Sequence, residues 1–304
     1  MKRASLEDLL EKTSRTFALS IPVLPEPTRR EVMIAYLLFR IADTFEDASD
    51  WEPDFRIEAL EDFSGLLRTS SRPEAERLAA KWSGAGPSPH AGYRELIAEV
   101  PFVLEAFDGL SAEAIEAVRT HVLRSARGMA GYVARTRAGA LVLADLPDLK
   151  AYCYVVAGIV GEMLTELFLL GRQELSDVAP FLRERAAAFG EALQLVNILK
   201  DSAADASEGR RYLPQGVARG EVFALARRDL GAAGEYIAAL QSAGAPRGLV
   251  EFTALPVLLA RATLDQIEAR GPGSKVGRAE VFFLTQKLKR ALDRGDPAVP
   301  VTAG

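Results

Sequence analysis

The chain has 304 residues, of which 49% are hydrophobic and 26% charged, and its 42 acidic and 37 basic side chains give a formal net charge of -5. This composition excludes a disordered, collagen-like or disulfide-stapled chain, and the single Cys153 excludes an internal disulfide. The acidic balance also argues against nucleic acid as the main partner, because phosphate binding needs a basic surface. With His90 and His121 as the only histidines, any metal must be held by oxygen atoms, which favours a hard cation such as Mg2+.

Neither the first residues nor the most apolar stretches have the pattern of a membrane segment. Residues 1–12 begin with basic side chains but contain no apolar core, so they are not a secretory signal. The stretches Ile34–Phe39 and Val155–Leu170 are interrupted by charged residues, whereas a transmembrane helix needs about 20 mostly apolar residues. We therefore expect a soluble, cytoplasmic protein without a transmembrane segment, for which peripheral contact with a membrane stays open.

Apolar residues recur every three or four positions along nearly the whole chain, which predicts an all-α protein. Turn-forming Gly, Pro and Ser residues interrupt this pattern, but no interruption has the length or composition of an interdomain linker. The sequence thus predicts a single domain over residues 1–304, with a loose tail at 294–304. The predicted helices cover residues 5–12, 28–48, 55–69, 73–82, 93–107, 111–136, 147–171, 178–202, 219–243, 246–269 and 276–293.

The helix predicted at 28–48 carries a cluster of acidic side chains. Asp43, Glu46 and Asp47 have the spacing i, i+3 and i+4, so they project within about 100° of one another, together with Arg40 and Tyr36. Like charges at this spacing repel, and a cation or an arginine is needed to neutralise them. The alternative is a solvated acidic helix end.

The helix predicted at 178–202, with the residues that follow it, carries a second stripe of oxygen donors. Asn197, Asp201 and Asp205 are spaced by four residues, and Gln194 joins them. Leucine, valine and isoleucine surround the stripe, so we expect the helix to be largely buried and its polar groups to need partners. A structural polar network and a metal site are both open for this helix alone.

Considered together, the two stripes match the requirements of a Mg2+-bridged diphosphate. Basic residues accompany each stripe: Arg40 the first, and Lys200, Arg210 and Arg211 the second. Carboxylates hold the metal ions, and the basic groups neutralise the leaving group. The alternative polyphosphate site, a GxxxxGK[ST] loop, is not in the sequence.

At these residues the sequence resembles the squalene and phytoene synthases, which are head-to-head prenyl diphosphate synthases. The resemblance rests on SRTFAL (14–19), AYLLFRIADTFEDA (35–48), AYCYVVAGIVGEML (151–164) and QLVNILKDSAADASEGRRYLP (194–214), in the family's order and spacing. The sequence looks closest to bacterial squalene and dehydrosqualene synthases. The resemblance implies an isoprenoid synthase fold, in which helices surround a central apolar cavity.

The resemblance also implies roles for individual residues. The metal ligands would be Asp43, Asp47 and the assisting Glu46 in one set, and Asn197, Asp201 and Asp205 in the other, holding Mg2+ or alternatively Mn2+. Tyr152 would transfer a proton or steady a carbocation, or else be a core aromatic; Arg40, Asp43 and Asp201 are the other expected catalytic residues. Contacts to diphosphate oxygens or to the surroundings of the metals would come from Ser14, Arg15, Tyr36, Arg40, Gln194, Lys200 and Arg210.

The activity implied is the coupling of two prenyl diphosphates, with farnesyl favoured, through a cyclopropylcarbinyl diphosphate to squalene, dehydrosqualene or a related product. Such chemistry needs a dry apolar pocket, which the apolar face of residues 150–170 would supply. Two geranylgeranyl units, giving phytoene, are the alternative. Use of NADPH stays open, because the family lacks a Rossmann motif, as this chain does.

The sequence departs from the family pattern at two places. Ala203 and Ala204 stand where the family often has an acidic residue before Asp205, and no tyrosine lies near Thr263. A non-catalytic scaffold or assembly factor with the same fold is one alternative, although both ligand sets are retained. A terpene cyclase or chain-elongating prenyltransferase is less favoured, because the SRTF and YCxxVAGxVG motifs are typical of the head-to-head branch.

Overall fold

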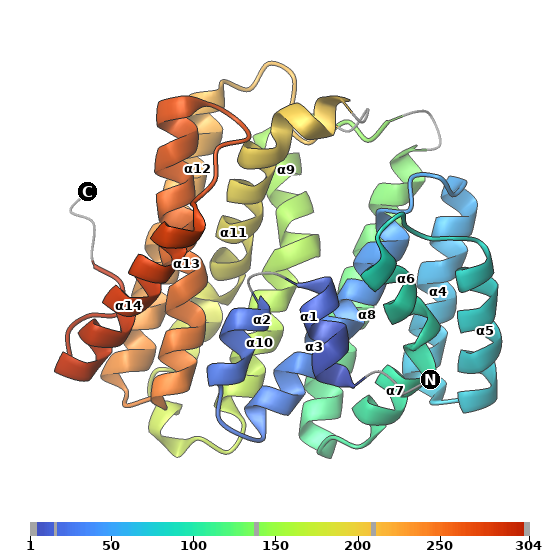
Figure 1. The fold of residues 1–304 in the computed structure, drawn as a ribbon, viewed down its shortest axis with the longest axis horizontal. Coiled ribbons are helices and arrows are strands. Elements are labelled where there is room, and N and C mark those ends of the chain that lie inside the picture. Colours follow the sequence, from blue (N-terminus) through green and yellow to red (C-terminus); the bar gives the residue numbers. More distant parts are fainter. Residues whose placement is uncertain (1–4, 15–16, 137–139, 208–210, 301–304) are drawn as a thin grey trace. The chain divides into compact units, whose positions relative to one another are not determined.

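The computed structural model describes residues 5–14, 17–136, 140–207 and 211–300 (Figure 1). The described residues form helices throughout, and the only β-type pairing among them is an isolated bridge between Val142 and Arg211. The prediction of an all-α protein is therefore confirmed. Internal contacts divide the chain into two compact units, Met1–Pro22 with Glu26–Gly139 and Val23–Pro25 with Ala140–Gly304. The single domain stays a prediction.

In the first unit, α3 (Thr28–Glu46) packs against α4 (Pro53–Thr69), α7 (Val100–Asp108) and α8 (Ala112–Arg135). Most side chains of α3 are buried, and its leucine, isoleucine and phenylalanine residues are fully enclosed. Little of the surface of α3 is therefore left for polar groups. The remaining helices of this unit are α1 (Leu6–Thr13), α2 (Phe17–Ser20), α5 (Arg72–Gly84) and α6 (Ala91–Ala98).

One boundary prediction in this unit is wrong. A single helix was expected over residues 93–107, but the structure has α6 and α7 separated at Glu99. Pro101, in the first turn of α7, explains the break, because proline has no N–H to donate and its ring clashes with the carbonyl four residues earlier. The short helix α2 was not predicted at all.

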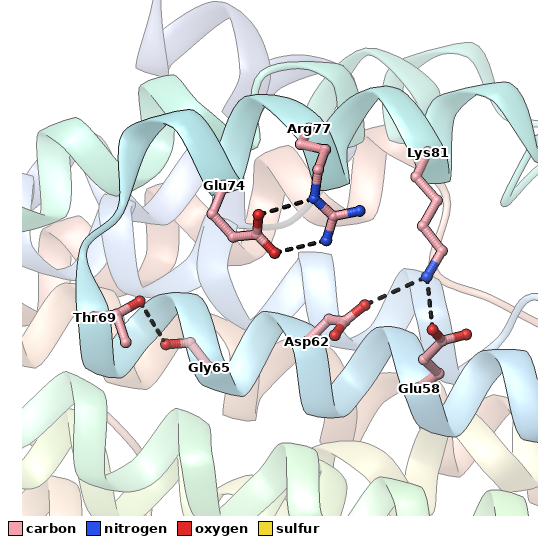
Figure 2. A network of polar contacts seen from close by, with 7 residues as sticks. All are labelled: Glu58, Asp62, Gly65, Thr69, Glu74, Arg77 and Lys81. Atoms are coloured by element: carbon pink, nitrogen blue, oxygen red, sulfur yellow. Dashed lines mark hydrogen bonds and ion pairs between the residues drawn. The ribbon is translucent and has the colours of Figure 1, made fainter.

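Ion pairs join the exposed surfaces of α4 and α5, as Figure 2 shows. Lys81 Nζ lies 2.8 Å from Glu58 Oε1 and 3.5 Å from Asp62 Oδ2, and Arg77 pairs with Glu74 within α5. Exposed pairs of this kind contribute about 0–1 kcal/mol each. Packing of the apolar faces, and not these pairs, therefore holds the two helices together.

In the second unit, α11 (Ala179–Ser207) packs against α10 (Ile159–Leu169), α12 (Arg219–Ser242) and α13 (Arg247–Arg270). The helix predicted at 147–171 is present as α9 (Leu146–Cys153) and α10, joined by the π-helical turn η3 (Tyr154–Gly158). Such π-helical turns are rare in proteins as a whole, but those that occur often lie at functional sites. Helix α14 (Arg278–Arg294) packs on α13 and completes the unit.

Glycines on both sides of the contact let the backbones of η3 and α10 approach that of α11 closely. A Cβ atom on Gly161 would overlap the carbonyl oxygen of Ala186, and one on Gly190 would overlap the carbonyl oxygen of Ala157. Nearby, the hydroxyl groups of Thr165 and Tyr236 form a buried hydrogen bond of 2.9 Å. The glycines of the YCxxVAGxVG segment thus serve helix packing.

We expect Gly190→Ala to lower the free energy of unfolding by about 1–3 kcal/mol, because the added methyl group meets backbone atoms that cannot move aside. Gly231→Ala is the matched control. No atom lies within 4 Å of its Cβ position in α12, so the same change there should raise stability by about 0.5–1 kcal/mol. Urea denaturation followed by circular dichroism measures both, and equal stability of the two variants would contradict the proposed contact.

The helix Leu146–Leu169 is long and apolar enough to cross a membrane by length and composition. Within its most apolar window, 56% of the residues are buried inside the protein. Buried core helices pass the same test, so the finding is weak evidence for a membrane span.

The expectation of a loose tail from residue 294 is wrong for the part that the structure describes. The Gln241 side chain donates to the Asp296 carbonyl at 2.8 Å and accepts from the Ala298 N–H at 2.9 Å. Ala298 and Val299 are buried, and Arg261 donates to the Pro300 carbonyl. The sequence PAVP lacks helical periodicity, but its small apolar side chains pack against α12 and α13.

Candidate functional site

In the first unit, Tyr36, Arg40 and Asp43 lie along one face of α3, as their spacing predicted. Arg40 Nη1 lies 3.4 Å from Asp43 Oδ2, and the side chains are 26% and 27% exposed. The guanidinium group also lies over two aromatic rings, 5.6 Å from the centre of Tyr36 and 5.4 Å from that of Tyr93. Tyr93, on α6, was missed in the sequence because it belongs to no motif.

The N-terminal SRTFAL segment approaches the same face. The Tyr36 hydroxyl donates a 2.7 Å hydrogen bond to the carbonyl of Thr13, and the rings of Phe17 and Tyr36 lie 5.6 Å apart. Ser14 Oγ accepts the N–H of Phe17 at 2.9 Å. The structure therefore brings Ser14 into the neighbourhood of Tyr36, whereas Arg15 lies outside the described residues.

The carboxylates of α3 have unusual proton affinities. Burial raises the pKa of Asp43 to about 6; the charge of Arg40 opposes this shift and that of Asp47 adds to it. Burial and the charge of Asp47 raise the pKa of Glu46 well above its usual range, against the effect of Arg56. Asp47 itself is exposed at the C-terminal end of the helix.

These pKa shifts mean that the negative charges of this cluster are incompletely neutralised by the protein. A solvated acidic helix end does not fit Asp43 and Glu46, because the first is mostly and the second almost fully buried. An added cation would restore the ionised form of both.

In the second unit, the expectation of a buried polar stripe on α11 is wrong for two of its members. Asn197 is exposed, and the side chain of Asp201 is 50% exposed. Lys200 Nζ lies 3.0 Å from Asn197 Oδ1 and 3.3 Å from Asp201 Oδ2. The buried side of α11 is formed by its leucine and isoleucine residues, and the polar stripe lies on another side of the helix. A buried structural network is thereby disfavoured for Asp201.

The other two members of the stripe are half-buried, and Asp205 lines a cavity of about 230 Å³. Four-residue steps drift by about 40° each, which turns Asp205 away from the exposed face of Asn197. Arg211, Tyr212 and Gln215 reach the cavity from the segment after α11, which the bridge to Val142 holds in place. Gln194 is not among the cavity residues, and Arg210 lies outside the described part of the chain.

Tyr152 contacts Tyr212, one of the residues that line this cavity. Its side chain is buried, at 3% exposure, and its ring stacks on Tyr212 with 5.2 Å between ring centres and 23° between planes. Tyr154 points elsewhere, because its hydroxyl donates to Glu162 Oε1 at 3.1 Å. The sequence predicted no role for Tyr212. Its stacking partner lies 60 positions earlier in the chain, so no local sequence pattern indicates the contact.

The donor chemistry of both clusters fits a hard divalent cation, since all the donors are carboxylate or amide oxygens. Within the described part of the chain, no three Asp, Glu, His or Cys side chains form a group that could hold a metal ion by themselves. This combination suits Mg2+, which keeps several waters and usually binds one or two carboxylates together with substrate phosphates. The roles predicted for the individual residues stay predictions.

The fold is shared with solved squalene and dehydrosqualene synthases. The ligand complex of TcSQS has a TM-score of 0.73 at 24% identity, covering 95% of this chain and 88% of that one. A dehydrosqualene synthase complex has a TM-score of 0.56 at 22% identity, covering 95% of each chain. The chain therefore has the all-α fold of squalene synthases.

Sequence similarity identifies the family of this chain. The Squalene/phytoene synthase family model matches residues 10–283, and the chain belongs to this family. Squalene synthase ERG9 of Candida albicans is 30% identical over 208 residues, and the squalene synthase of Yarrowia lipolytica is 31% identical over 211. Each match covers 68% of this chain and 44% of the relative, so the matched region spans less than half the length of these fungal proteins.

Proposed function

We propose that this protein is a Mg2+-dependent prenyltransferase that joins two prenyl diphosphates head to head and releases diphosphate. The observation that carries the proposal is the incompletely neutralised cluster on α3, where Asp43 and Glu46 have raised pKa values beside Arg40. A cluster of this kind costs stability unless a cation is added, and family members are typically Mg2+-dependent.

The residues of the chain divide into two roles in this proposal. On α3 the carboxylates, and on α11 the set of Asn197, Asp201 and Asp205, would each hold Mg2+, which when bound draws electrons from diphosphate oxygens. Arg40, Lys200 and Arg211 would pair directly with those oxygens, as charge-assisted hydrogen bonds to phosphate are strong. The contacts of Arg40 with Tyr36 and Tyr93 hold its guanidinium group in one orientation before substrate arrives.

Tyr152 would act after ionisation. Its ring has the electron-rich face that stabilises a cation, and its stacking on Tyr212 keeps the ring in place beside the cavity that holds Asp205. On α10, Ile159, Met163 and Leu167 are buried and offer no groups that could attack a carbocation. We include in the proposal a central apolar cavity that would enclose the prenyl chains.

Two farnesyl diphosphates are the substrates that we propose, with squalene or dehydrosqualene as product. The curated relatives at about 30% identity are named squalene synthases, which supports this choice over two geranylgeranyl units. Conversion through a cyclopropylcarbinyl diphosphate follows from the family. Use of NADPH would decide between a reduced and an unreduced hydrocarbon.

The test is incubation of the purified protein with farnesyl or geranylgeranyl diphosphate and Mg2+, with and without NADPH, followed by extraction and mass spectrometry of the lipids. We expect Mg2+-dependent diphosphate release and a C30 product from farnesyl diphosphate. A C40 product alone, formed from geranylgeranyl diphosphate, would instead support phytoene synthesis. No diphosphate release from either substrate would leave the non-catalytic scaffold as the better description.

A further inference from the structure

The outward face of α14 combines exposed aromatic rings with basic side chains. Phe282 and Phe283 are 67% and 63% exposed, the largest values among the big apolar side chains described as exposed. At 100° per residue the two rings project within about 100° of each other, Arg290 falls between them and Lys287 lies about 40° beyond. Burying two phenylalanines is favourable, so their exposure on an ordered helix needs an explanation.

The charge of α14 is opposite to that of the whole protein. Five basic and two acidic side chains give this helix a net charge of +3, whereas the chain carries -5. Both acids are engaged: Asp293 pairs with Arg247 at 2.5 Å, and Glu280 accepts from Gln266 at 2.6 Å.

Four exposed basic groups make no ion pair with any residue in the described segments: Lys275, Arg278, Lys287 and Arg290.

The opposite side of α14 is fixed to the protein. Leu288, on the side of α14 away from the two rings, is buried. Lys289, which flanks Phe282, reaches back to α13, with its Nζ 3.7 Å from Glu251 Oε1. Together with the Arg247 and Gln266 contacts, these interactions attach α14 to α13 along its length. The aromatic and basic face is therefore presented on a rigid element.

We propose that this face, made of Lys275, Arg278, Phe282, Phe283, Lys287 and Arg290, docks the protein on an anionic lipid bilayer. Phenylalanine rings insert at the boundary between headgroups and acyl chains, and arginine and lysine bind the negative surface. A two-fold dimer formed through this face would place its positive charges against themselves, so the uncompensated charge favours an anionic lipid surface over a second copy of the chain. The proposal stands independently of the proposed activity, although a hydrocarbon product would leave most readily into a bilayer.

The experiment is co-sedimentation of the full chain with phosphatidylcholine vesicles that contain or lack phosphatidylglycerol, at low and high salt. We expect binding only to the anionic vesicles, reduced by salt. Phe282→Ser with Phe283→Ser should weaken partitioning about tenfold or more, and Lys287→Glu with Arg290→Glu should remove the salt-sensitive part.

Two controls match these variants. Arg30→Glu with Arg68→Glu makes the same change in charge at exposed sites of the first unit, and Val142→Ser removes an exposed apolar side chain elsewhere. Both should bind vesicles as the parent does. Each α14 variant should also retain the parent's melting temperature, which shows that lost binding is not lost folding.

Equal binding to both vesicle types, no binding to either, or undiminished binding of both α14 variants would overturn the proposal. Dimers seen by light scattering that Phe282→Ser with Phe283→Ser converts to monomers would replace it with a self-association surface. Diphosphate release, measured in detergent on the same samples, separates the two proposals. Vesicle binding without turnover would contradict only the proposed activity.

Discussion

Asp201→Asn should lower Mg2+-dependent diphosphate release by about 100-fold or more while leaving the melting temperature and helical content unchanged. The Asp201 side chain is half exposed and its ion pair is with the neighbouring Lys200, so the fold does not depend on its charge. Asparagine keeps the shape but removes the negative charge that a divalent cation requires, and loss of one such electrostatic contact costs about 10²–10³ in rate. Steady-state assays over a range of Mg2+ concentration measure the effect.

Asp177→Asn provides the matched control for this prediction. Asp177 is exposed just before α11 and undergoes the same chemical change outside the polar stripe. It should retain full turnover. Undiminished activity of Asp201→Asn would exclude Asp201 from metal binding, and a large fall in its melting temperature would restore the structural network as the reason for this residue.

Asp43→Asn should also abolish most turnover, but unlike Asp201→Asn it should change the stability of the fold, and raise it. The pKa of Asp43 is raised from its ordinary value near 4 to about 6, so the folded protein binds this proton more tightly than the unfolded chain. The group therefore favours folding below pH 4 and loses that contribution as the pH rises through 6. In EDTA above pH 6, Asp43→Asn should be more stable than the parent by about 1–2 kcal/mol, after allowance for partial exposure.

The pH dependence distinguishes this explanation from a general effect of substitution. The stability advantage of Asp43→Asn should disappear as the pH falls from about 6 to about 4, because the parent's carboxyl group is then protonated as well. Urea denaturation at several pH values measures it, with Asp50→Asn, the same change at an exposed site, as the control. An advantage that is constant with pH, or a destabilised Asp43→Asn, would contradict an incompletely neutralised Asp43.

Local geometry explains what could be predicted from the sequence. Helical periodicity placed most helices within a few residues of their observed ends, because the apolar face of a helix repeats every three or four positions. The same regularity put Tyr36, Arg40 and Asp43 on one face of α3, as the structure confirms. Contacts within one helix depend only on spacing along the chain.

Contacts between helices, and the exposure of each face, were decided only by the tertiary structure. The sequence predicted a stripe of oxygen donors on α11. The neighbouring elements cover only part of that helix, and for this reason Asp201 is exposed while Asp205 lines a cavity. The contacts of Tyr93 with Arg40 and of Tyr212 with Tyr152 join residues more than 50 positions apart, for which spacing carries no information. By itself the sequence determined the helices, the family motifs and the type of metal that the donors suit. The raised pKa values of Asp43 and Glu46 needed the tertiary structure, because burial by distant side chains causes them.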